Sequence, residues 1–258
     1  MFFRPCIDIH NGKVKQIVGG SLRDEGNCAS DNFVSQMDAG FYGDLYKKYG
    51  FSGGHIIILN ASDSDFYNED KEQAFKALKR FKGGLQVGGG INDKNAMDFI
   101  NAGASHVIVT SFVFKDGRIN YDNLKKMVDT VGKEKLVLDL SCRKKDGLYY
   151  IVTDRWQKFT DTVLSKDVIM ELALYCDEFL IHAVDVEGKA MGIEIPVVQM
   201  LGELENVKVT YAGGISSEED LKILKNEGKN KVDFTIGSAL EIFGGKMTFQ
   251  DIIKYCQD

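Results

Sequence analysis

The chain has very little proline and no long apolar run, and these two shortages exclude several architectures. Only Pro5 and Pro196 occur in 258 residues, so a proline-rich linker between domains is excluded. No apolar stretch approaches the roughly 18 residues that a membrane-spanning helix needs. The opening, MFFRPCIDIH, has only two apolar residues after Met1 before Arg4, so we expect no secretory signal peptide. We therefore expect no membrane partner.

Cysteine and basic residues are too scattered or too few for other classes of protein. The five cysteines are an odd number without a C-x-x-C pair, so no disulfide framework is expected. Reduced thiols fit a cytoplasmic protein, which is the location we predict. No cluster of Cys and His has metal-ligand spacing, so we predict no metal. The formal net charge of −6 argues against a nucleic-acid partner, so any anionic ligand must be held by local amides and a few side chains.

The remaining composition is ordinary for a globular protein. Hydrophobic residues make up 44% of the chain and charged residues 27%. A length of 258 residues is near that of one (β/α)8 domain, and no change in composition divides the chain. We predict a single domain over residues 1–258, and we expect it to be monomeric.

One stretch near the C-terminus carries glycine at two successive strand ends. Residues 209–240, VTYAGGISSEEDLKILKNEGKNKVDFTIGSAL, read as strand, Gly213-Gly214, helix, strand and Gly237-Ser238. Bare backbone thus lies before a helix N-terminus twice, and amides beside the positive end of a helix dipole suit a phosphate. In an eight-stranded parallel barrel a phosphate site often follows strands seven and eight.

The same pattern occurs in residues 85–114, LQVGGGINDKNAMDFINAGASHVIVTSFVF. Gly89-Gly90 matches the later glycine pair, and Thr110-Ser111 matches the later strand end. Two strand-end aspartates, Asp8 and Asp139, are 131 residues apart, while Gly89 and Gly213 are 124 apart. Both offsets are close to half the chain. The sequence therefore predicts two related halves, each with one strand-end aspartate and one phosphate cradle.

The order of the predicted elements indicates an α/β fold. Eight strands alternate with helices, which favours a parallel sheet. The repeat, and the absence of a G-x-G-x-x-G motif after the first strand, favour a closed (β/α)8 TIM barrel with twofold half-barrel repeat over an open doubly wound sheet. The strands are predicted at 3–9, 55–59, 85–87, 107–109, 135–140, 178–183, 209–212 and 234–236. Helices are predicted at 37–49, 69–81, 94–101, 119–131, 163–175, 193–204 and 249–256, and hairpin strands at 14–18 and within 141–153.

Two aspartates are the first candidates for chemistry. Asp8 and Asp139 end strands one and five, which face each other across the mouth of such a barrel. Paired carboxylates can divide the roles of acid and base. The alternative is that each caps a loop or pairs with a nearby Lys or Arg. The glycine pairs also have an alternative, namely tight strand-to-helix turns.

Other candidates depend on position alone. Trp156, the only tryptophan, could stack on a flat ligand ring or pack in the core. His182 ends strand six and should point into the mouth, although a lone histidine is often structural. Asp185 and Glu187 follow it, with a solvated loop as the simpler interpretation. His55 begins strand two, so we place it at the far end of the barrel.

Seven segments together resemble a known enzyme family. They are CIDIHNGKVKQIVGG (6–20), LQVGGGIND (85–93), VIVTS (107–111), VLDLSCRKKDG (137–147), FLIHAVDVEG (179–188), VTYAGGISS (209–217) and FTIGSALEIFGG (234–245). The resemblance is to the phosphoribosylformimino-5-aminoimidazole carboxamide ribotide isomerases of histidine biosynthesis, in their fungal and plant-type branch. It implies a (β/α)8 barrel that isomerises a small-molecule bis-phosphate, an aminoaldose, to the aminoketose by an Amadori rearrangement. It implies no cofactor and no metal.

The resemblance also implies roles for residues. Asp8 would be the general base and Asp139 the general acid that opens the ribose ring, although which does which stays open. His182 stands where bacterial members carry a catalytic-site threonine. Asn92 stands where they carry an arginine. The charge of that arginine could be supplied here by Arg143 or Lys144. Residues implied in substrate or phosphate binding are Gly20, Gly89, Gly90, Thr110, Ser111, Arg143, Trp156, Gly188, Gly213, Gly214, Gly237 and Ser238.

Two other functions stay open on the sequence. The cyclase subunit of imidazole glycerol phosphate synthase shares the barrel, both aspartates and both cradles. That cyclase usually has a lysine shortly after its first aspartate, whereas this chain has His10. A non-catalytic phosphosugar-binding barrel is the third possibility, but a pure binder would gain nothing from two carboxylates beside an anionic ligand.

Overall fold

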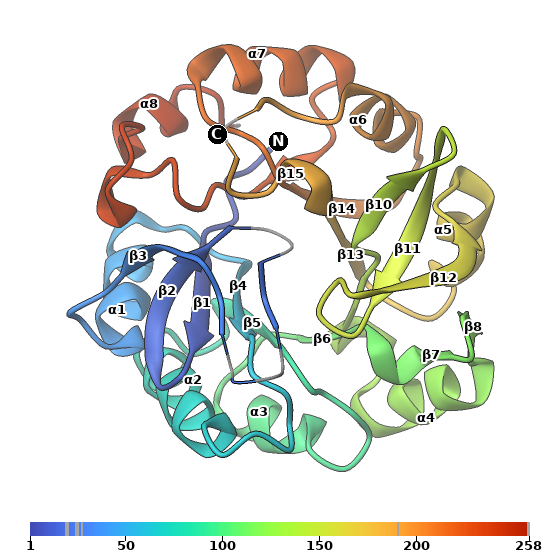
Figure 1. Cartoon of the computed structure of the whole chain (residues 1–258), viewed down its shortest axis with the longest axis horizontal. Coiled ribbons are helices and arrows are strands. Elements are labelled where there is room, and N and C mark those ends of the chain that lie inside the picture. Colours follow the sequence, from blue (N-terminus) through green and yellow to red (C-terminus); the bar gives the residue numbers. More distant parts are fainter. Residues whose placement is uncertain (19–20, 24–25, 27, 190, 257–258) are drawn as a thin grey trace.

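A closed parallel barrel forms the centre of the molecule. The structure is a computed structural model that describes residues 1–18, 21–23, 26, 28–189 and 191–256. The eight parallel strands pair in chain order, and the backbone amide of Arg4 closes the ring by donating to the Phe234 carbonyl at 2.7 Å (Figure 1). The predicted TIM-barrel fold is confirmed. The barrel strands are β1 (Cys6–His10), β4 (Gly54–Ile58), β5 (Leu85–Gly88), β6 (Val107–Val109), β9 (Leu136–Asp139), β13 (Glu178–His182), β14 (Lys208–Ala212) and β15 (Asp233–Phe234).

Eight α-helices of the described chain surround these strands as an outer ring (Figure 1). Local signals fix their ends: Asp38 caps the first helix, which ends at the left-handed Gly50, and Ser217 forms a capping box with Asp220. Within the described residues, no helix is long and apolar enough to cross a membrane. The helices are α1 (Ala39–Tyr49), α2 (Tyr67–Arg80), α3 (Ala96–Ala102), α4 (Tyr121–Val131), α5 (Lys166–Leu172), α6 (Ile195–Gly202), α7 (Glu218–Glu227) and α8 (Phe249–Ile253).

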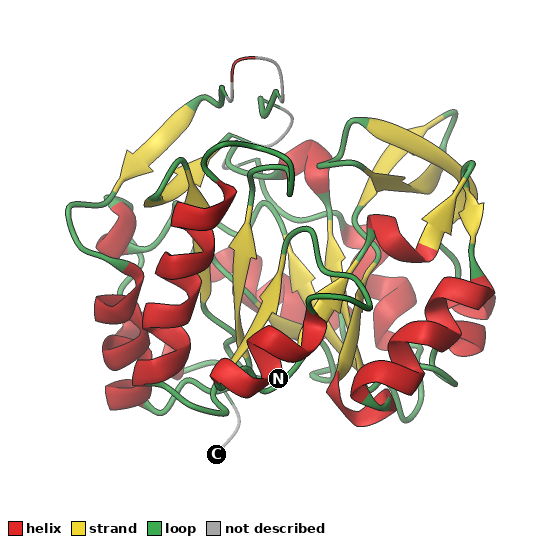
Figure 2. Ribbon diagram, turned by 90° about the horizontal axis from the view of Figure 1, so that it is seen from below, coloured by secondary structure: helices red, strands yellow, loops and turns green. Residues whose placement is uncertain are grey.

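Each half of the barrel carries an antiparallel extension after its first strand. In the first half, β2 (Lys13–Ile17) pairs with β1, and β3 (Asp31–Val34) pairs with β2. In the second half, β10 (Cys142–Lys145), β11 (Leu148–Thr153) and β12 (Lys158–Val163) form a separate sheet after β9. Both extensions stand at one end of the barrel, and the N-terminus lies at the other (Figure 2). This arrangement agrees with the predicted twofold repeat.

Two strands of these extensions were not predicted. β3 and β12 have mostly polar or exposed residues, so neither shows a buried strand pattern. The predicted helix over 163–175 is shorter, because Val163 pairs with Tyr150 and the Ser165 side chain caps a helix that begins at Lys166. The predicted helix over 119–131 begins at Tyr121, since β7 (Phe114–Lys115) pairs with β8 (Arg118–Ile119).

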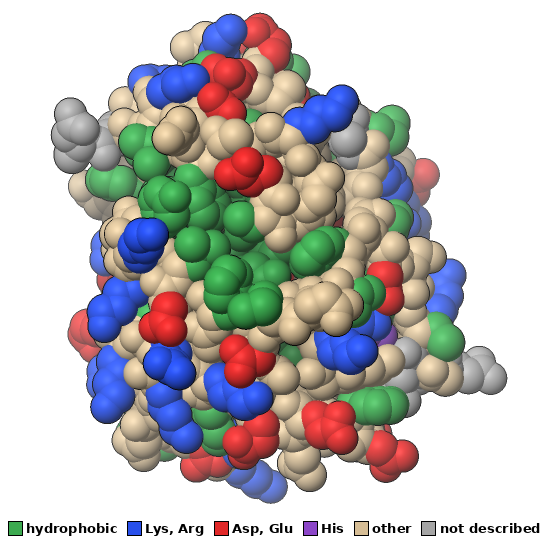
Figure 3. Space-filling view, turned by 90° about the vertical axis from the view of Figure 1, so that its left-hand side faces the viewer, with side chains coloured by type: hydrophobic (Ala, Val, Ile, Leu, Met, Phe, Trp, Pro, Cys, Tyr) green, Lys and Arg blue, Asp and Glu red, His purple; other side chains and the backbone are tan. Residues whose placement is uncertain are grey.

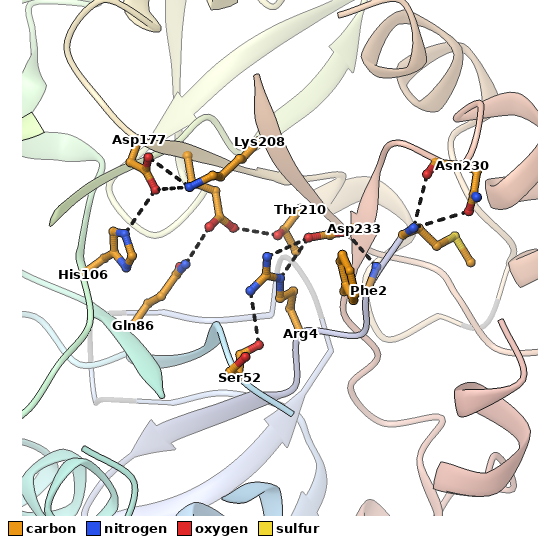
Figure 4. Close-up of polar contacts among 12 residues, drawn as sticks. Phe2, Arg4, Ser52, Gln86, His106, Asp177, Lys208, Thr210, Asn230 and Asp233 are labelled. Atoms are coloured by element: carbon orange, nitrogen blue, oxygen red, sulfur yellow. Dashed lines mark hydrogen bonds and ion pairs between the residues drawn. The ribbon is translucent and has the colours of Figure 1, made fainter. Parts of the chain in front are cut away.

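Apolar and polar layers fill the barrel interior. Ile108, Val137, Leu180 and Ala212 form a small apolar cluster inside it. At the end that carries the N-terminus, buried Glu178 accepts hydrogen bonds from Gln86 and Thr210 at 2.9 and 2.8 Å (Figure 4). The same end holds the ion pair of Arg4 with Asp233 and that of Lys208 with Asp177. These contacts close one end of the barrel and leave the other for a ligand.

A hydrophobic patch covers one outer side of the molecule (Figure 3). Exposed apolar side chains from β3, α1 and the turn between them are Val34, Met37, Phe41 and Tyr49. None of these residues lines the central cavity described below.

Candidate active site

A cavity of about 680 Å³ lies inside the barrel at the end that carries the two extensions. Every barrel strand, or the turn after it, contributes to its wall. Its volume suits a small-molecule ligand. Of the residues selected from the sequence, those that line it are Asp8, Gly89, Gly90, Thr110, Ser111, Asp139, Trp156, His182, Gly188, Gly213, Gly214, Gly237 and Ser238.

Two other residues were predicted for the site. Gly20 lies outside the described residues. Arg143 does not line the cavity; its Nε donates to Asp185 at 2.9 Å, and its guanidinium lies over the Phe159 ring. The Asp185 carboxylate also accepts from the Lys144 backbone amide at 2.7 Å. This placement gives no support to Arg143 as a phosphate ligand.

Asp8 has a carboxyl group that can exchange a proton near neutral pH. Its Oδ2 accepts a hydrogen bond from Gln16 Nε2 of β2 at 3.0 Å. Burial and then the negative charge of Glu187 raise the pKa of Asp8 to about 7, although His182 and the Gln16 bond oppose the rise. A carboxyl group with such a pKa can serve as a base or an acid at physiological pH.

Asp139 has a different environment. Its Oδ1 accepts from the Ser141 amide at 2.7 Å and from the Ser141 hydroxyl at 2.6 Å, and its Oδ2 accepts from Thr110 Oγ1 at 3.1 Å. Burial raises the pKa of Asp139, while these hydrogen bonds and the charge of His182 counteract the rise. Thr110, predicted as a phosphate ligand, thus donates to a carboxylate in this structure.

His182 forms a close pair with Glu187. His182 Nε2 lies 2.9 Å from Glu187 Oε2, and the Trp156 ring packs edge-on against the imidazole with centroids 4.8 Å apart. Trp156 Nε1 also donates to the Ser141 hydroxyl at 3.1 Å. The expectation of a solvated loop is wrong for Glu187, because the short helix η4 (Val184–Val186) turns its side chain back into the cavity.

The two glycine turns have nearly the same geometry. The φ angles are 103° and 68° at Gly89 and Gly90, and 117° and 78° at Gly213 and Gly214. All four lie in the left-handed region that favours glycine. A Cβ on Gly89 would overlap the Ile58 carbonyl oxygen, and one on Gly213 would lie 2.6 Å from that of Ala183. Each turn therefore needs glycine for conformation and for space.

The amides at the start of α7 are already bonded within the chain. The Ser216 and Ser217 amides donate to Asp220 Oδ2 at 2.9 and 3.0 Å. In the first half, the Asn92 amide donates to Asn95 Oδ1 at 2.9 Å. An anion in either cradle is therefore expected to meet the glycine turn rather than these amides.

Several residues of the site were missed in the sequence. Arg155 and Lys246 add two cations to the wall. Arg155 lies in a turn whose residues 154–156 all have φ between 51° and 67°, and no simple sequence pattern predicts such a turn. Lys246 could have been found, because it follows Gly244-Gly245 shortly after strand eight. The two cations partly balance the five carboxylate side chains that line the cavity, which are Asp8, Asp63, Asp139, Asp154 and Glu187.

His55 lies at the start of the second barrel strand, as predicted, but it also lines the cavity. The cavity therefore extends well below the strand ends, and discounting His55 as a site residue was wrong. Burial and the charge of His182 lower the pKa of His55 to about 3, so it is neutral. His10 is buried but does not line the cavity. Within the described chain, no group of three His, Cys, Asp or Glu side chains could hold a metal ion.

Comparisons with known proteins agree with this geometry. A family model described as "Histidine biosynthesis protein" matches residues 3–248. The chain is 51% identical over 257 residues to the chloroplastic 1-(5-phosphoribosyl)-5-((5-phosphoribosylamino)methylideneamino) imidazole-4-carboxamide isomerase of Medicago truncatula, covering 98% of this chain and 81% of that protein. Isomerases of the same name from Neurospora crassa and Saccharomyces cerevisiae are 44% and 42% identical, with 97% of each relative covered and 98% of this chain.

Proposed function

The chain belongs to the histidine biosynthesis protein family, and on this basis we propose that Asp8 and Asp139 are the base and the acid of its reaction. The chain is an isomerase of histidine biosynthesis that converts the aminoaldose ProFAR to the aminoketose PRFAR. The observation that supports the assignment is that the cavity holds two partly buried carboxyl groups from equivalent strands, β1 and β9, in unequal environments. Unequal environments allow two carboxyl groups to take opposite roles.

Ring opening is the first step. Asp139, as the acid, would give its proton to the ring oxygen of the aminated ribose, so that the C1–O bond breaks and a Schiff base forms between C1 and nitrogen. The Ser141 and Thr110 hydroxyl groups, which donate to this carboxylate, stabilise the anion that the transfer leaves.

Proton abstraction follows. Asp8 would remove the proton from C2, and the electron pair would move toward the Schiff base to give an enolamine. A pKa near 7 makes Asp8 a stronger base than an ordinary carboxylate while leaving about half of it ionised at pH 7. Protonation at C1 and loss of the C2 hydroxyl proton then give the ketose.

The two glycine turns would bind the two phosphate groups. Gly89 and Gly90 with Ser111 line one side of the cavity, and Gly213 and Gly214 with Gly237-Ser238 line the other. Lys246 would add charge at the second cradle, since it follows the strand-eight turn. A substrate with a phosphate at each end would then lie across the mouth, with its reacting sugar above the carboxylates.

A single-turnover assay tests the function. Purified protein is mixed in excess with ProFAR, with neither glutaminase nor ammonia present. Formation of PRFAR is expected. Turnover of PRFAR only, with ammonia added, would indicate the cyclase instead, and tight binding without turnover would indicate a binding barrel. The names of the relatives favour the isomerase over both.

Trp156 is expected to stack on the imidazole of the substrate. Replacing it by Phe keeps an aromatic ring but loses area and the hydrogen bond to Ser141, so KM should rise about tenfold with a smaller change in kcat. As the only tryptophan, it should also change its fluorescence when substrate binds. Equal KM values for the Trp156→Phe variant and the unaltered chain would contradict the stacking role.

Further proposals concern organisation and location. We propose one domain over residues 1–258, supported by the pairing of Phe3 with Phe234, which joins the first and last barrel strands.

We propose that the protein is a monomer. Sedimentation velocity tests this, since the patch in Figure 3 is the face on which copies would associate.

We propose a cytoplasmic location, which the five free thiols support. Imaging of a tagged chain tests it against the plastid location in the name of the Medicago relative.

A further inference from the structure

The imidazole of His182 is held in one orientation in the wall of the cavity. Its Nε2 is hydrogen-bonded to Glu187 Oε2 at 2.9 Å, and the Trp156 ring lies nearly perpendicular to it, with centroids 4.8 Å apart. The side chains of His182 and Glu187 are only 16% and 19% exposed. Among the described residues, Glu187 is the one hydrogen-bond partner of the ring, so Nδ1 is left to meet a ligand. A carboxylate at Nε2 keeps the proton on that nitrogen and the lone pair on Nδ1.

His182 lies within electrostatic reach of both proposed catalytic carboxyl groups. When the imidazole is protonated, its charge lowers the pKa of both Asp8 and Asp139, against the effect of burial. The remaining titratable group that faces it is His55 from β4, which is neutral. His182 ends β13, the strand that pairs with β9 and sets Leu180 opposite Asp139, and its side chain lines the same cavity as Asp8 and Asp139.

The proton balance of the isomerisation leaves one transfer unassigned. The reaction moves the C2 hydrogen to C1 and the hydrogen of the C2 hydroxyl to the ring oxygen, with no net gain or loss. Asp8 can carry out the first of these two transfers, by taking the proton from C2 and returning it to C1. Asp139 gives a proton to the ring oxygen, and it must regain one before the next turnover.

We propose that His182, oriented by Glu187, takes the C2 hydroxyl proton at Nδ1 and passes it to Asp139, so that the acid is restored in each cycle. This inference rests on the function proposed above. As the O–H bond breaks, its electrons form the C2 carbonyl and C1 takes the proton held by Asp8. The imidazolium then gives its Nδ1 proton to the Asp139 carboxylate and becomes neutral again.

The role of Glu187 is to position the imidazole and to stabilise its cation. Burial alone would lower the pKa of His182, but the charge and hydrogen bond of Glu187, with the charges of Asp139 and Asp8, raise it. The same logic applies to the buried carboxylate of a Ser-His-Asp triad, which stabilises the imidazolium without taking its proton. Glu187 is thus a positioning residue, and His182 is the group that touches substrate.

The Glu187→Gln variant tests the relay. Glutamine keeps the size and an accepting oxygen but loses the charge, so the single-turnover rate should fall about 10- to 100-fold while the substrate Kd changes less than about threefold. The substrate carries deuterium at C2, and the substrate left at half conversion is analysed for loss of that label. The loss should increase in the variant, because the enolamine waits longer for the relay and returns to substrate more often.

A matched control is available at the opposite end of the barrel. His106 Nε2 lies 3.3 Å from Asp177 Oδ2, so Asp177→Asn alters another histidine–carboxylate pair outside the cavity (Figure 4). This control should keep the rate and the label retention of the unaltered chain, and melting curves should show that both variants fold.

Three results separate the possibilities. A rate for Glu187→Gln within threefold of the unaltered chain would overturn the relay. So would a slower rate with the same label loss per turnover, since a merely structural change slows every step together. Full activity of Asp8→Asn or Asp139→Asn would instead overturn the acid–base assignment itself, whatever Glu187→Gln does.

Discussion

Asp8→Asn is expected to lower the isomerisation rate at least about 10³-fold and, at the same time, to stabilise the folded protein above pH 7. The rate falls because an amide cannot remove the C2 proton. In the unaltered chain the rate should increase as pH rises through about 7, where Asp8 ionises, and the variant should lack this limb. Stopped assays from pH 5 to 9 measure both effects.

The gain in stability follows from the raised pKa. An aspartate in an unfolded chain has a pKa of about 3.9, whereas Asp8 has one of about 7 in the folded protein. The folded state therefore binds the proton more tightly, and the stability due to this group is present below pH 4 and is lost as pH rises through 7. Asparagine is never charged, so the variant does not lose this stability. Above pH 7 its free energy of unfolding should exceed that of the unaltered chain by about 2 kcal/mol, after allowance for solvent in the cavity.

Asp233→Asn is the control for stability, because it should change the free energy of unfolding in the opposite direction to Asp8→Asn. Asp233 accepts hydrogen bonds from Arg4 and from the Phe2 amide at the far end of the barrel, so its charge is compensated. Urea unfolding should show lower stability for Asp233→Asn with an unchanged rate. An Asp8→Asn protein that is less stable than the unaltered chain at pH 8, or that keeps its activity, would contradict the account of Asp8.

Gly214→Ala is expected to increase KM at least about tenfold and to lower the free energy of unfolding by about 2 kcal/mol. The residue has a φ of 78°, and an added Cβ would overlap the Gly192 carbonyl oxygen. The turn must then shift, and it carries the backbone that would bind the second phosphate. Substrate saturation and urea unfolding measure the two effects.

Gly50→Ala separates backbone strain from displacement of the turn. Gly50 ends α1 with a φ of 72°, and nothing lies within 4 Å of the place that its Cβ would occupy. This control should lose up to about 1 kcal/mol of stability without a change in KM. If Gly50→Ala and Gly214→Ala have the same KM, the glycine turn has no part in binding.

The features predicted well from the sequence depend on local and repeated signals. Apolar runs ending in Gly89-Gly90 and Gly213-Gly214 fixed two strands and the turns that follow them, because only glycine fits those φ angles. The spacing of Asp8 and Asp139 pointed to equivalent strands, and the cavity contains both side chains.

The features that were missed depend on contacts between distant segments. Glu187 reaches His182 only because η4 folds back beneath the strand end, and a loop of similar composition could equally lie in solvent. The depth of the cavity decides the place of His55, and no local pattern encodes depth. Arg143 has the charge that a phosphate needs, but Asp185, 42 residues later, pairs with it.

The closure of the barrel has a consequence for how the chain is made. The bond from Arg4 to Asp233 and the pairing of Phe3 with Phe234 join residues about 230 positions apart. During synthesis, β1 can pair with β2 early, but Phe3 and Arg4, which precede β1, cannot meet Phe234 until β15 has emerged. This part of the strand edge therefore stays open through nearly the whole of translation, and the ring becomes complete only in the last step of folding.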